Sequence, residues 1–247
     1  MKFIFVTLFP EQIEAAAAYS ILRRGVEAGA IQIECINPRD FSLDRHHSAD
    51  DAPFGGGVGM VLKPEPMVEA IRAARARAPG APVIAMSPGG TTFKQALAET
   101  WAREETGLVF VCGHYEGFDE RIYHWVDVKI SIGDFVLTGG ELPALMIMDA
   151  VSRFVPGVLG KLASAEEDSF SSGLLEYPQY TRPVVFEGME VPEVLRNGNH
   201  RMIARWRRKQ ALKATYLLRP DMLPAEPGKL DAKLLKEIQE ELEKDRF

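Results

Sequence analysis

Apolar residues in the first half of the chain fall into short continuous runs, with polar and amphipathic segments between them. Continuous runs are typical of strands covered on both faces, as in a parallel sheet, whereas half-exposed strands alternate apolar and polar residues. Alternation of such strands with helices predicts an α/β fold with a mostly parallel sheet. The predicted strands are residues 3–8, 31–36, 83–86, 108–112 and 126–132.

Helices are predicted where apolar residues recur three or four positions apart, because this spacing places them on one face. Proline after a strand, or a threonine pair after glycine, marks expected helix starts at Pro10, Pro64 and Thr91–Thr92. Residues 141–155 are apolar nearly all round, which predicts a buried helix that packs against a second copy of the chain. The apolar positions of the other helices are Ile13, Ala17 and Ile21; Met67, Ile71 and Ala74; and Phe93, Leu97 and Trp101.

The pattern changes beyond residue 160. The segment ASAEEDSFSSG, residues 163–173, is small, polar and acidic and has neither period, so it predicts a flexible connection. A strong helix is then predicted at about residues 200–218 and an amphipathic one from Leu230, with no strand pattern after about residue 186. The predicted organisation is a first domain at 1–160, a linker or lid at 161–173 and a small all-α domain at 174–247.

Composition and charge narrow the functional classes. A chain of 247 residues that is 46% hydrophobic can bury a substantial core. We expect a cytoplasmic protein, because there is no signal-peptide pattern, no membrane-length apolar run, and only two cysteines. The formal net charge of −6 disfavours nucleic acid as a partner, but residues 196–219 hold eight Lys or Arg and no acid, which predicts a basic patch.

Four glycine-bearing turns follow the predicted strands, at residues 87–90, 113–117, 132–134 and 138–140. One such glycine can simply turn the chain, but three successive strands ending this way favour a ligand site, because loops cluster at the carboxyl ends of parallel strands. The first strand lacks the dinucleotide pattern G-x-G-x-x-G, and the glycine run 55–59 lacks a phosphate-loop pattern, so it is either a surface loop or one that closes over substrate. Loops that have few basic side chains but offer backbone donors and apolar residues suit an uncharged adenine. S-adenosylmethionine carries such an adenine without phosphates.

A series of motifs then covers most of the chain. They are PFGGGVGM, SPGG, FVCGHYEGFDER, SIGDFVLTGGELPALMIMDAVSRFVPGVLG, EEDSFSSGLLEYPQYTRP and GNHRMIARWRRKQAL. In this order they resemble the bacterial tRNA (guanine-N1)-methyltransferases of the SPOUT superfamily. The resemblance implies a deep C-terminal trefoil knot, a homodimer whose active sites are shared between subunits, and S-adenosylmethionine bound by the knot loops. The matching cofactor positions are Pro88, Gly89, Gly113, Ser131, Ile132, Gly133, Asp134, Phe135, Val136, Leu137, Gly139 and Gly140.

The resemblance also implies the reaction, which is methyl transfer to N1 of guanosine 37 in tRNA, next to the anticodon. Guanine N1 carries a hydrogen at neutral pH, so a general base has to accept it. The resemblance implies Asp168 as this base, Arg153 as the residue that stabilises charge on guanine O6, and Glu116 at the guanine edge. From the residues alone, Asp168 is one acid in a solvated linker, Arg153 can pair with Asp149 on a helix surface, and Glu116 is a loop acid.

The basic segment is the expected contact for the tRNA anticodon stem-loop. Arg201, Arg205 and Arg208 fall on one helix face, where they can bind phosphates, and an ordinary solvated face would mix both signs of charge. The opposite, mostly apolar stripe consists of Ile203, Trp206, Gln210, Ala214 and Leu217.

Two other functions stay open at this point. One is a SPOUT-type ribose 2′-O-methyltransferase, although a carboxylate and an arginine suit an acidic ring nitrogen better. The other is a non-catalytic RNA-binding protein with the same fold, which the intact motif residues disfavour. The sulfonium methyl needs no activating metal and the residues suggest no metal site; the resemblance implies some magnesium dependence without a dedicated site.

Overall fold

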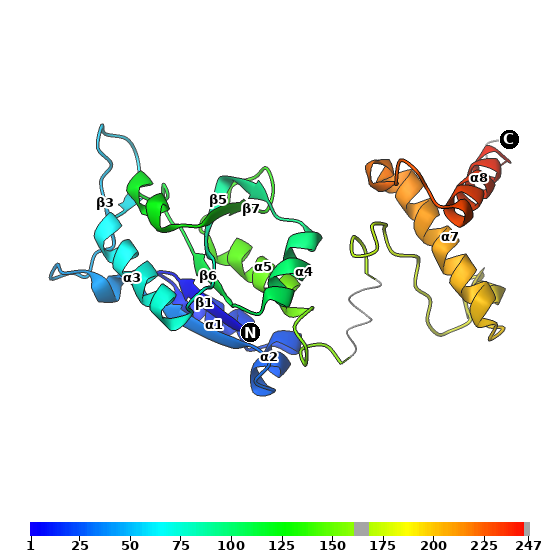
Figure 1. The fold of residues 1–247 in the computed structure, drawn as a ribbon, viewed down its shortest axis with the longest axis horizontal. Helices are drawn as coiled ribbons and strands as arrows, with labels where there is room; N and C mark the ends of the chain where they lie inside the picture. The colour runs from blue at the N-terminus through cyan, green and yellow to red at the C-terminus, as the bar shows by residue number, and fades with distance from the viewer. Residues whose placement is uncertain (161–167, 245–247) are drawn as a thin grey trace. The chain divides into compact units, whose positions relative to one another are not determined.

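The computed structural model describes residues 1–160 and 168–244. The chain divides into two compact units, Met1–Leu162 and Ala163–Phe247 (Figure 1). The first unit contains a sheet with helices on both faces, and the second is mostly helical. The division of function between a methyl-donor domain, a linker and an RNA-binding domain stays a prediction.

A five-stranded parallel sheet forms the centre of the first unit, with strand order β2–β1–β6–β5–β7. This confirms the predicted α/β fold with a mostly parallel sheet. The central strand β6 is buried at every position, which is why its sequence is continuously apolar. The strands are β1 (Lys2–Val6), β2 (Gln32–Ile36), β5 (Val83–Thr92), β6 (Leu108–Val111) and β7 (Val128–Ser131), and a separate small pair consists of β3 (Asp50–Asp51) and β4 (Val61–Leu62).

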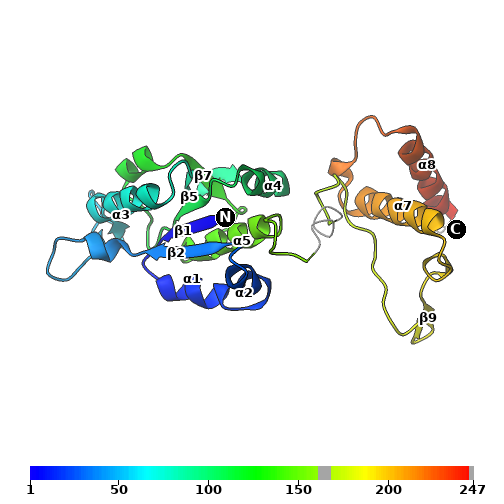
Figure 2. The ribbon, with the colours of Figure 1, turned by 60° about the horizontal axis from the view of Figure 1, so that its bottom comes forward.

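Two hydrophobic cores lie on the two faces of this sheet. Ile4 and Val6 of β1 belong to the core under α3, whereas Phe3 and Phe5 belong to the core under the other helices. Alternate residues of a strand point to opposite faces, so one short strand contributes to both cores. Figure 2 shows α3 and the pair α1 and α2 on opposite sides of β1 and β2. The helices are α1 (Pro10–Ala17), α2 (Ser20–Glu27), α3 (Pro64–Arg77), α4 (Gln95–Glu104) and α5 (Glu141–Ser152).

Two predicted helix boundaries are wrong. The pattern through Ile13 and Ile21 forms two helices rather than one, because Ser20 has a left-handed backbone with φ of 53°. Thr91–Thr92 do not start a helix. After a register shift beyond Met86, they resume the pairing of β5 with β7, and the helix begins only at α4.

Helix α5 is shorter than predicted, and one of its edges is exposed in the single chain. It ends at Ser152 rather than at residue 155. Leu142 is 48% exposed and Met146 is 58% exposed, one turn apart. The single chain therefore leaves one apolar edge of α5 in contact with solvent.

The second unit is organised around α7 (His200–Leu218) and α8 (Lys229–Lys244). Leu212 of α7 is fully buried with Leu234 and Ile238 of α8. A short antiparallel hairpin, β8 (Val185–Phe186) and β9 (Met189–Glu190), corrects the prediction of an all-α domain. Strands of two residues are too short to produce a period-two pattern in the sequence.

Candidate active site

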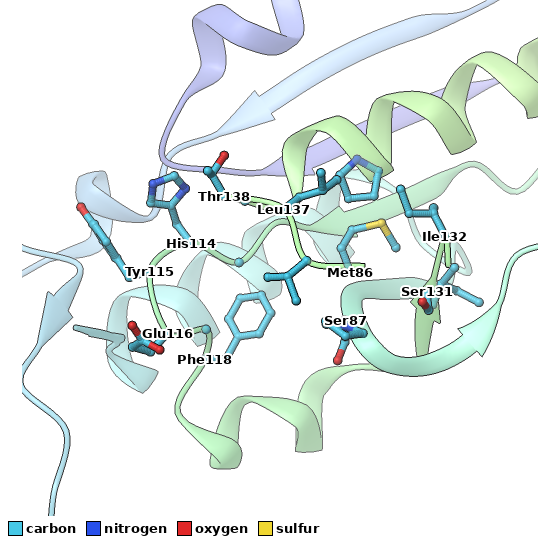
Figure 3. A pocket seen from close by; sticks show the side chains of 18 of the residues that line it. Met86, Ser87, His114, Tyr115, Glu116, Phe118, Ser131, Ile132, Leu137 and Thr138 are labelled. Carbon is cyan, nitrogen blue, oxygen red and sulfur yellow. The ribbon is translucent and has the colours of Figure 1, made fainter. Parts of the chain in front are cut away.

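A cavity of about 440 Å³ lies at the carboxyl ends of β6 and β7 and beside the register shift within β5, where Met86, Ser87 and Pro88 line it. Residues from all four glycine-bearing turns line it, together with Pro143 at the start of α5. Figure 3 shows His114, Tyr115 and Glu116 on one side of this cavity and Met86, Ser87, Ser131 and Ile132 on the other. Small-molecule sites commonly have volumes of roughly 300–1,000 Å³, so the cavity has the size of a cofactor site.

Most of the predicted cofactor residues line this cavity. Gly89 and Asp134 do not: Gly89 lies where β5 is out of register with β7, and both residues are exposed. A role for these two residues in cofactor binding stays a prediction. The predicted residues that do line the cavity are Pro88, Gly113, Ser131, Ile132, Gly133, Phe135, Val136, Leu137, Gly139 and Gly140, with Glu116 from the predicted substrate residues.

Among the acidic and basic side chains that line the cavity, acids are present and lysine and arginine are absent. Glu116 and Glu120 are its acids, and no lysine or arginine is among the lining residues. Phosphate groups are generally held by arginine or lysine side chains. The cavity therefore favours a neutral or cationic ligand over a phosphorylated one.

Gly140 lies where the loop before α5 crosses the end of β6. A Cβ atom at this position would lie 2.8 Å from Cys112 Cα and 2.8 Å from the Gly113 nitrogen, both backbone atoms that cannot move aside. The Gly140 N–H donates to the Gly113 carbonyl at 2.7 Å, and Gly139 forms an isolated bridge with His114. The absence of a side chain thus lets two backbone segments meet at the wall of the cavity.

Beneath this crossing, a buried polar pair joins the end of β1 to the start of α5. Thr7 is fully buried and Glu141 is 2% exposed. The Thr7 hydroxyl donates to Glu141 Oε1 at 2.7 Å and accepts from the Phe9 N–H at 2.9 Å. Glu141 is the first residue of α5, where the helix dipole favours an acid. Sequence analysis missed this pair; an acid directly after two glycines at a predicted helix start was the available signal.

Aromatic residues that sequence analysis did not single out form one wall of the cavity. The His114 ring lies 4.7 Å from the Phe9 ring and 4.8 Å from the Tyr115 ring, measured between centroids. Tyr115 has a left-handed φ of 56°, a conformation that costs energy outside glycine and occurs often at functional sites. The buried His114 Nδ1 atom has no hydrogen-bond partner among the described residues. Their position inside the glycine-bearing turn 113–117 was the signal that could have found them.

Glu116 links the cavity to the glycine run 55–59. Its N–H donates to the Met60 carbonyl at 3.0 Å, and a Cβ atom at Gly59 would lie 2.6 Å from Glu116 Cγ. Val58, in the run itself, is 93% exposed. The run is therefore a surface loop whose end contacts the Glu116 turn, and its closure over a substrate stays a prediction.

Arg153, one of the two residues predicted to perform the chemistry, does not line the cavity. Arg153 directly follows α5, is half-buried, and its backbone N–H donates to the Asp149 carbonyl at 3.3 Å. Asp168 belongs to the second unit and is half-exposed. Their catalytic roles stay predictions.

Two of the arginines predicted to bind RNA are ion-paired within the second unit. Arg205 lies 2.7 Å from Glu237, and Arg208 lies 2.6 Å from Asp231, with both acids on α8. Arg201 is exposed and has no ion pair among the residues that the structure describes.

The buried side of α7 differs from the apolar stripe expected from its sequence. Its buried residues are Ala211, Leu212 and Thr215, which lie toward the Arg205 side of the helix. Trp206 is half-buried and packs against Tyr180, with 6.2 Å between ring centroids. The stripe through Trp206 is thus not the main core face of this helix.

Within residues 1–160 and 168–244, no group of three or more His, Cys, Asp or Glu is placed to hold a metal ion. No helix in the same ranges is long and apolar enough to cross a membrane. Burial raises the pKa of the Cys112 thiol, next to the cavity, well above its ordinary value. This thiol is therefore not a nucleophile near neutral pH.

The sequence matches the family described as tRNA (Guanine-1)-methyltransferase TrmD over residues 1–225. It is 56% identical over 222 residues to the tRNA (guanine-N(1)-)-methyltransferase of Desulfitobacterium hafniense, which covers 90% of this chain and 84% of that protein. Proteins of the same name from Dehalococcoides mccartyi and Bacillus subtilis are each 53% identical. These two matches cover 96% and 92% of this chain and 97% and 94% of the relatives, respectively.

Proposed function

Because the chain belongs to the tRNA (guanine-1)-methyltransferase family, we propose that it transfers the methyl group of S-adenosylmethionine to N1 of guanosine 37 in tRNA. The enzyme class, a tRNA (guanine-N1)-methyltransferase, follows directly from the family. The observation that carries the donor assignment is the cavity at the strand ends, which is lined by Glu116 and Glu120 and by no lysine or arginine.

S-adenosylmethionine fits this cavity in size and polarity. Adenine needs apolar contacts and backbone hydrogen bonds, and Ile132, Leu137 and the glycine-bearing loops offer both. When bound, the donor supplies a methyl group on a positively charged sulfur, which the two lining acids favour electrostatically. The donor has no phosphate, and its sulfonium and ammonium groups outweigh its one carboxylate, so the absence of lysine and arginine from the lining is consistent with this ligand.

The proton chemistry is assigned to Asp168 of the second unit and to Arg153 of the first. Asp168 accepts the N1 proton of guanine, because a carboxylate is a suitable general base for an acidic ring nitrogen. Arg153 donates to guanine O6 and stabilises the negative charge that develops there. Glu116, in the cavity wall, contacts the guanine edge.

A homodimer with shared active sites is part of the proposal. Val136, in the loop before α5, is 84% exposed, and Leu142 and Met146 form an exposed apolar edge of α5. Exposed apolar residues grouped beside a site are typical of an interface, and a symmetric dimer places the same patch of both subunits together. The proposal also includes the trefoil knot, which is supported by the close crossing at Gly140. It further includes a magnesium dependence without a dedicated site and action in the cytoplasm.

The proposed function is tested with a labelled methyl donor and two tRNA transcripts that differ only in G or A at position 37. We expect label in the G37 transcript alone, recovered as N1-methylguanosine after digestion to nucleosides. Equal labelling of both transcripts contradicts the assignment to guanine N1. Label recovered on ribose would establish the 2′-O-methyltransferase alternative, and binding without labelling would establish the non-catalytic one.

Two variants separate donor binding from chemistry. Asp168→Ala should lose turnover but keep S-adenosylmethionine binding. Gly113→Val should lose donor binding, because even a Cβ at Gly113 would lie only 3.1 Å from the Phe118 ring. Normal turnover by Asp168→Ala would assign the base to another group.

A further inference from the structure

The acids of α8 are arranged along the cations of α7. Arg205 donates both of its bonds to Glu237, at 2.7 and 2.8 Å, and Arg208 contacts Asp231 with two nitrogens, at 3.0 and 2.6 Å. Lys209 lies 2.5 Å from Glu241 and 3.4 Å from Glu237. Three cations of α7 are thereby balanced by three acids of α8.

These pairs are held in place by the core of the unit. Leu212 of α7 and Leu234 and Ile238 of α8 are fully buried, and they fix which side of α8 faces α7. The hydrogen bonds from Arg208 hold the pKa of Asp231 below its ordinary value, so this acid is ionised at neutral pH. The acids Glu240 and Glu243 of the same helix are exposed and have no contact with these cations.

Other cations of α7 are not balanced in this way. Arg201, Arg207 and Lys213 have no ion pair among the residues that the structure describes, and Arg207 lies over the Tyr177 ring at 4.9 Å. A phosphate can approach these side chains without displacing a carboxylate. At Arg205 or Arg208, the same phosphate would have to displace an acid that already makes two hydrogen bonds.

We propose that Asp231, Glu237 and Glu241 of α8 form an affinity-limiting surface, which neutralises Arg205, Arg208 and Lys209 toward RNA phosphates. This inference rests on the proposed function, because it assumes that α7 contacts tRNA. Phosphate contacts strengthen the binding of every RNA equally, since they carry no sequence information. Neutralising three of them weakens binding to all RNAs and leaves discrimination to the contacts at the target base.

The test replaces the three acids by their amides in the full-length protein, as Asp231→Asn, Glu237→Gln and Glu241→Gln together. The matched control is Glu226→Gln, Glu240→Gln and Glu243→Gln, which changes the net charge equally but releases no cation of α7. Binding of the G37 tRNA transcript and of an unrelated RNA hairpin is measured without methyl donor across a salt series.

We expect the first triple variant to bind both RNAs roughly tenfold more tightly near 50 mM salt, with a log–log salt slope steeper by about 2 to 3. The control should change affinity by about twofold or less, because distant exposed charges are screened. Affinity and slope that equal those of the control, or weaker binding than wild type, would overturn the proposal.

A second comparison holds even if the triple variant is poorly folded. Two double variants are compared. The variant Arg205→Gln/Arg208→Gln should weaken tRNA binding less than the variant Arg201→Gln/Arg207→Gln does, and the reverse order overturns the proposal. Failure of the proposed function is distinguishable, because methyl incorporation by the wild-type enzyme is measured separately from these affinities.

Discussion

Replacing Thr7 by valine should destabilise the first unit, because it removes one buried hydroxyl at nearly constant side-chain shape. The change leaves Glu141 Oε1 and the Phe9 N–H without the partner they have in the structure. An unsatisfied buried polar group costs about 1 to 3 kcal/mol, so two give about 2 to 6 kcal/mol. In a unit of this size, that loss lowers the melting temperature by roughly 4 to 24 °C.

Ser152→Ala is the matched control, because it removes a buried hydroxyl that makes no hydrogen bond to any residue the structure describes. Ser152 is 1% exposed, and its Oγ atom has no partner among the described residues. Its desolvation is therefore uncompensated, and removing it should leave stability unchanged or raise it by up to about 1 kcal/mol. Removing either of two similarly buried hydroxyls is thus expected to change the free energy of unfolding in different directions.

The assay is urea unfolding followed by tryptophan fluorescence. Trp101 and Trp125 lie in the first unit, so Trp206→Phe is included in every protein to remove the signal of the second unit. All proteins are compared at one concentration, because association makes apparent stability depend on concentration. If Thr7→Val is as stable as its parent, or Ser152→Ala loses as much as Thr7→Val, hydrogen bonding of the buried hydroxyl is not what stabilises this crossing.

Two further predictions concern the cavity wall and acid stability. Gly140→Ala should lower the affinity for S-adenosylmethionine at least about tenfold, because its Cβ meets backbone atoms, as measured by equilibrium dialysis. Gly160→Ala adds a Cβ in open space and should bind normally. Equal affinities of the two variants would contradict the steric argument. Hydrogen bonds from Ser48 and then from Lys63 hold the pKa of Asp44 well below its ordinary value, so its contribution to stability is complete above about pH 5 and is lost as the pH falls toward 2. Asp44→Asn should flatten the fall in urea stability over this pH range, and unchanged pH profiles would show that the pairing contributes nothing.

The parallel sheet could be predicted from sequence because its strands are covered on both faces. β6 is apolar at every position since both of its neighbours and both helical layers exclude water from it. The ligand cavity could be placed at strand ends for a related reason, since glycine-bearing turns follow β6 and β7, although the turn predicted at residues 87–90 lies within β5 at its register shift. These features depend on local sequence and on one general rule of α/β topology.

Features that depend on distant contacts could not be predicted. Thr91–Thr92 resembled a helix start after two glycines, but their strand partners are Ile130 and Ser131, which nothing in the local sequence identifies. Arg205 and Arg208 belong to a helix without acids, yet their partners lie 32 and 23 residues further along the chain. A helical pattern identifies which residues share a face, but it does not identify what that face meets.

The distribution of charge connects the fold to the proposed reaction. A phosphate-rich substrate and a cationic methyl donor need environments of opposite sign, and one concave site lined by arginines would repel the donor. In this chain, the cavity of the first unit is lined by acids without lysine or arginine, and the run of cations belongs to α7 of the second unit. The acids of α8 balance Arg205, Arg208 and Lys209 of that run, which leaves Arg201, Arg207 and Lys213 as the cations of α7 without an ion pair among the described residues. Because phosphate contacts carry no sequence information, an enzyme built in this way has to discriminate between RNAs through contacts at the target base.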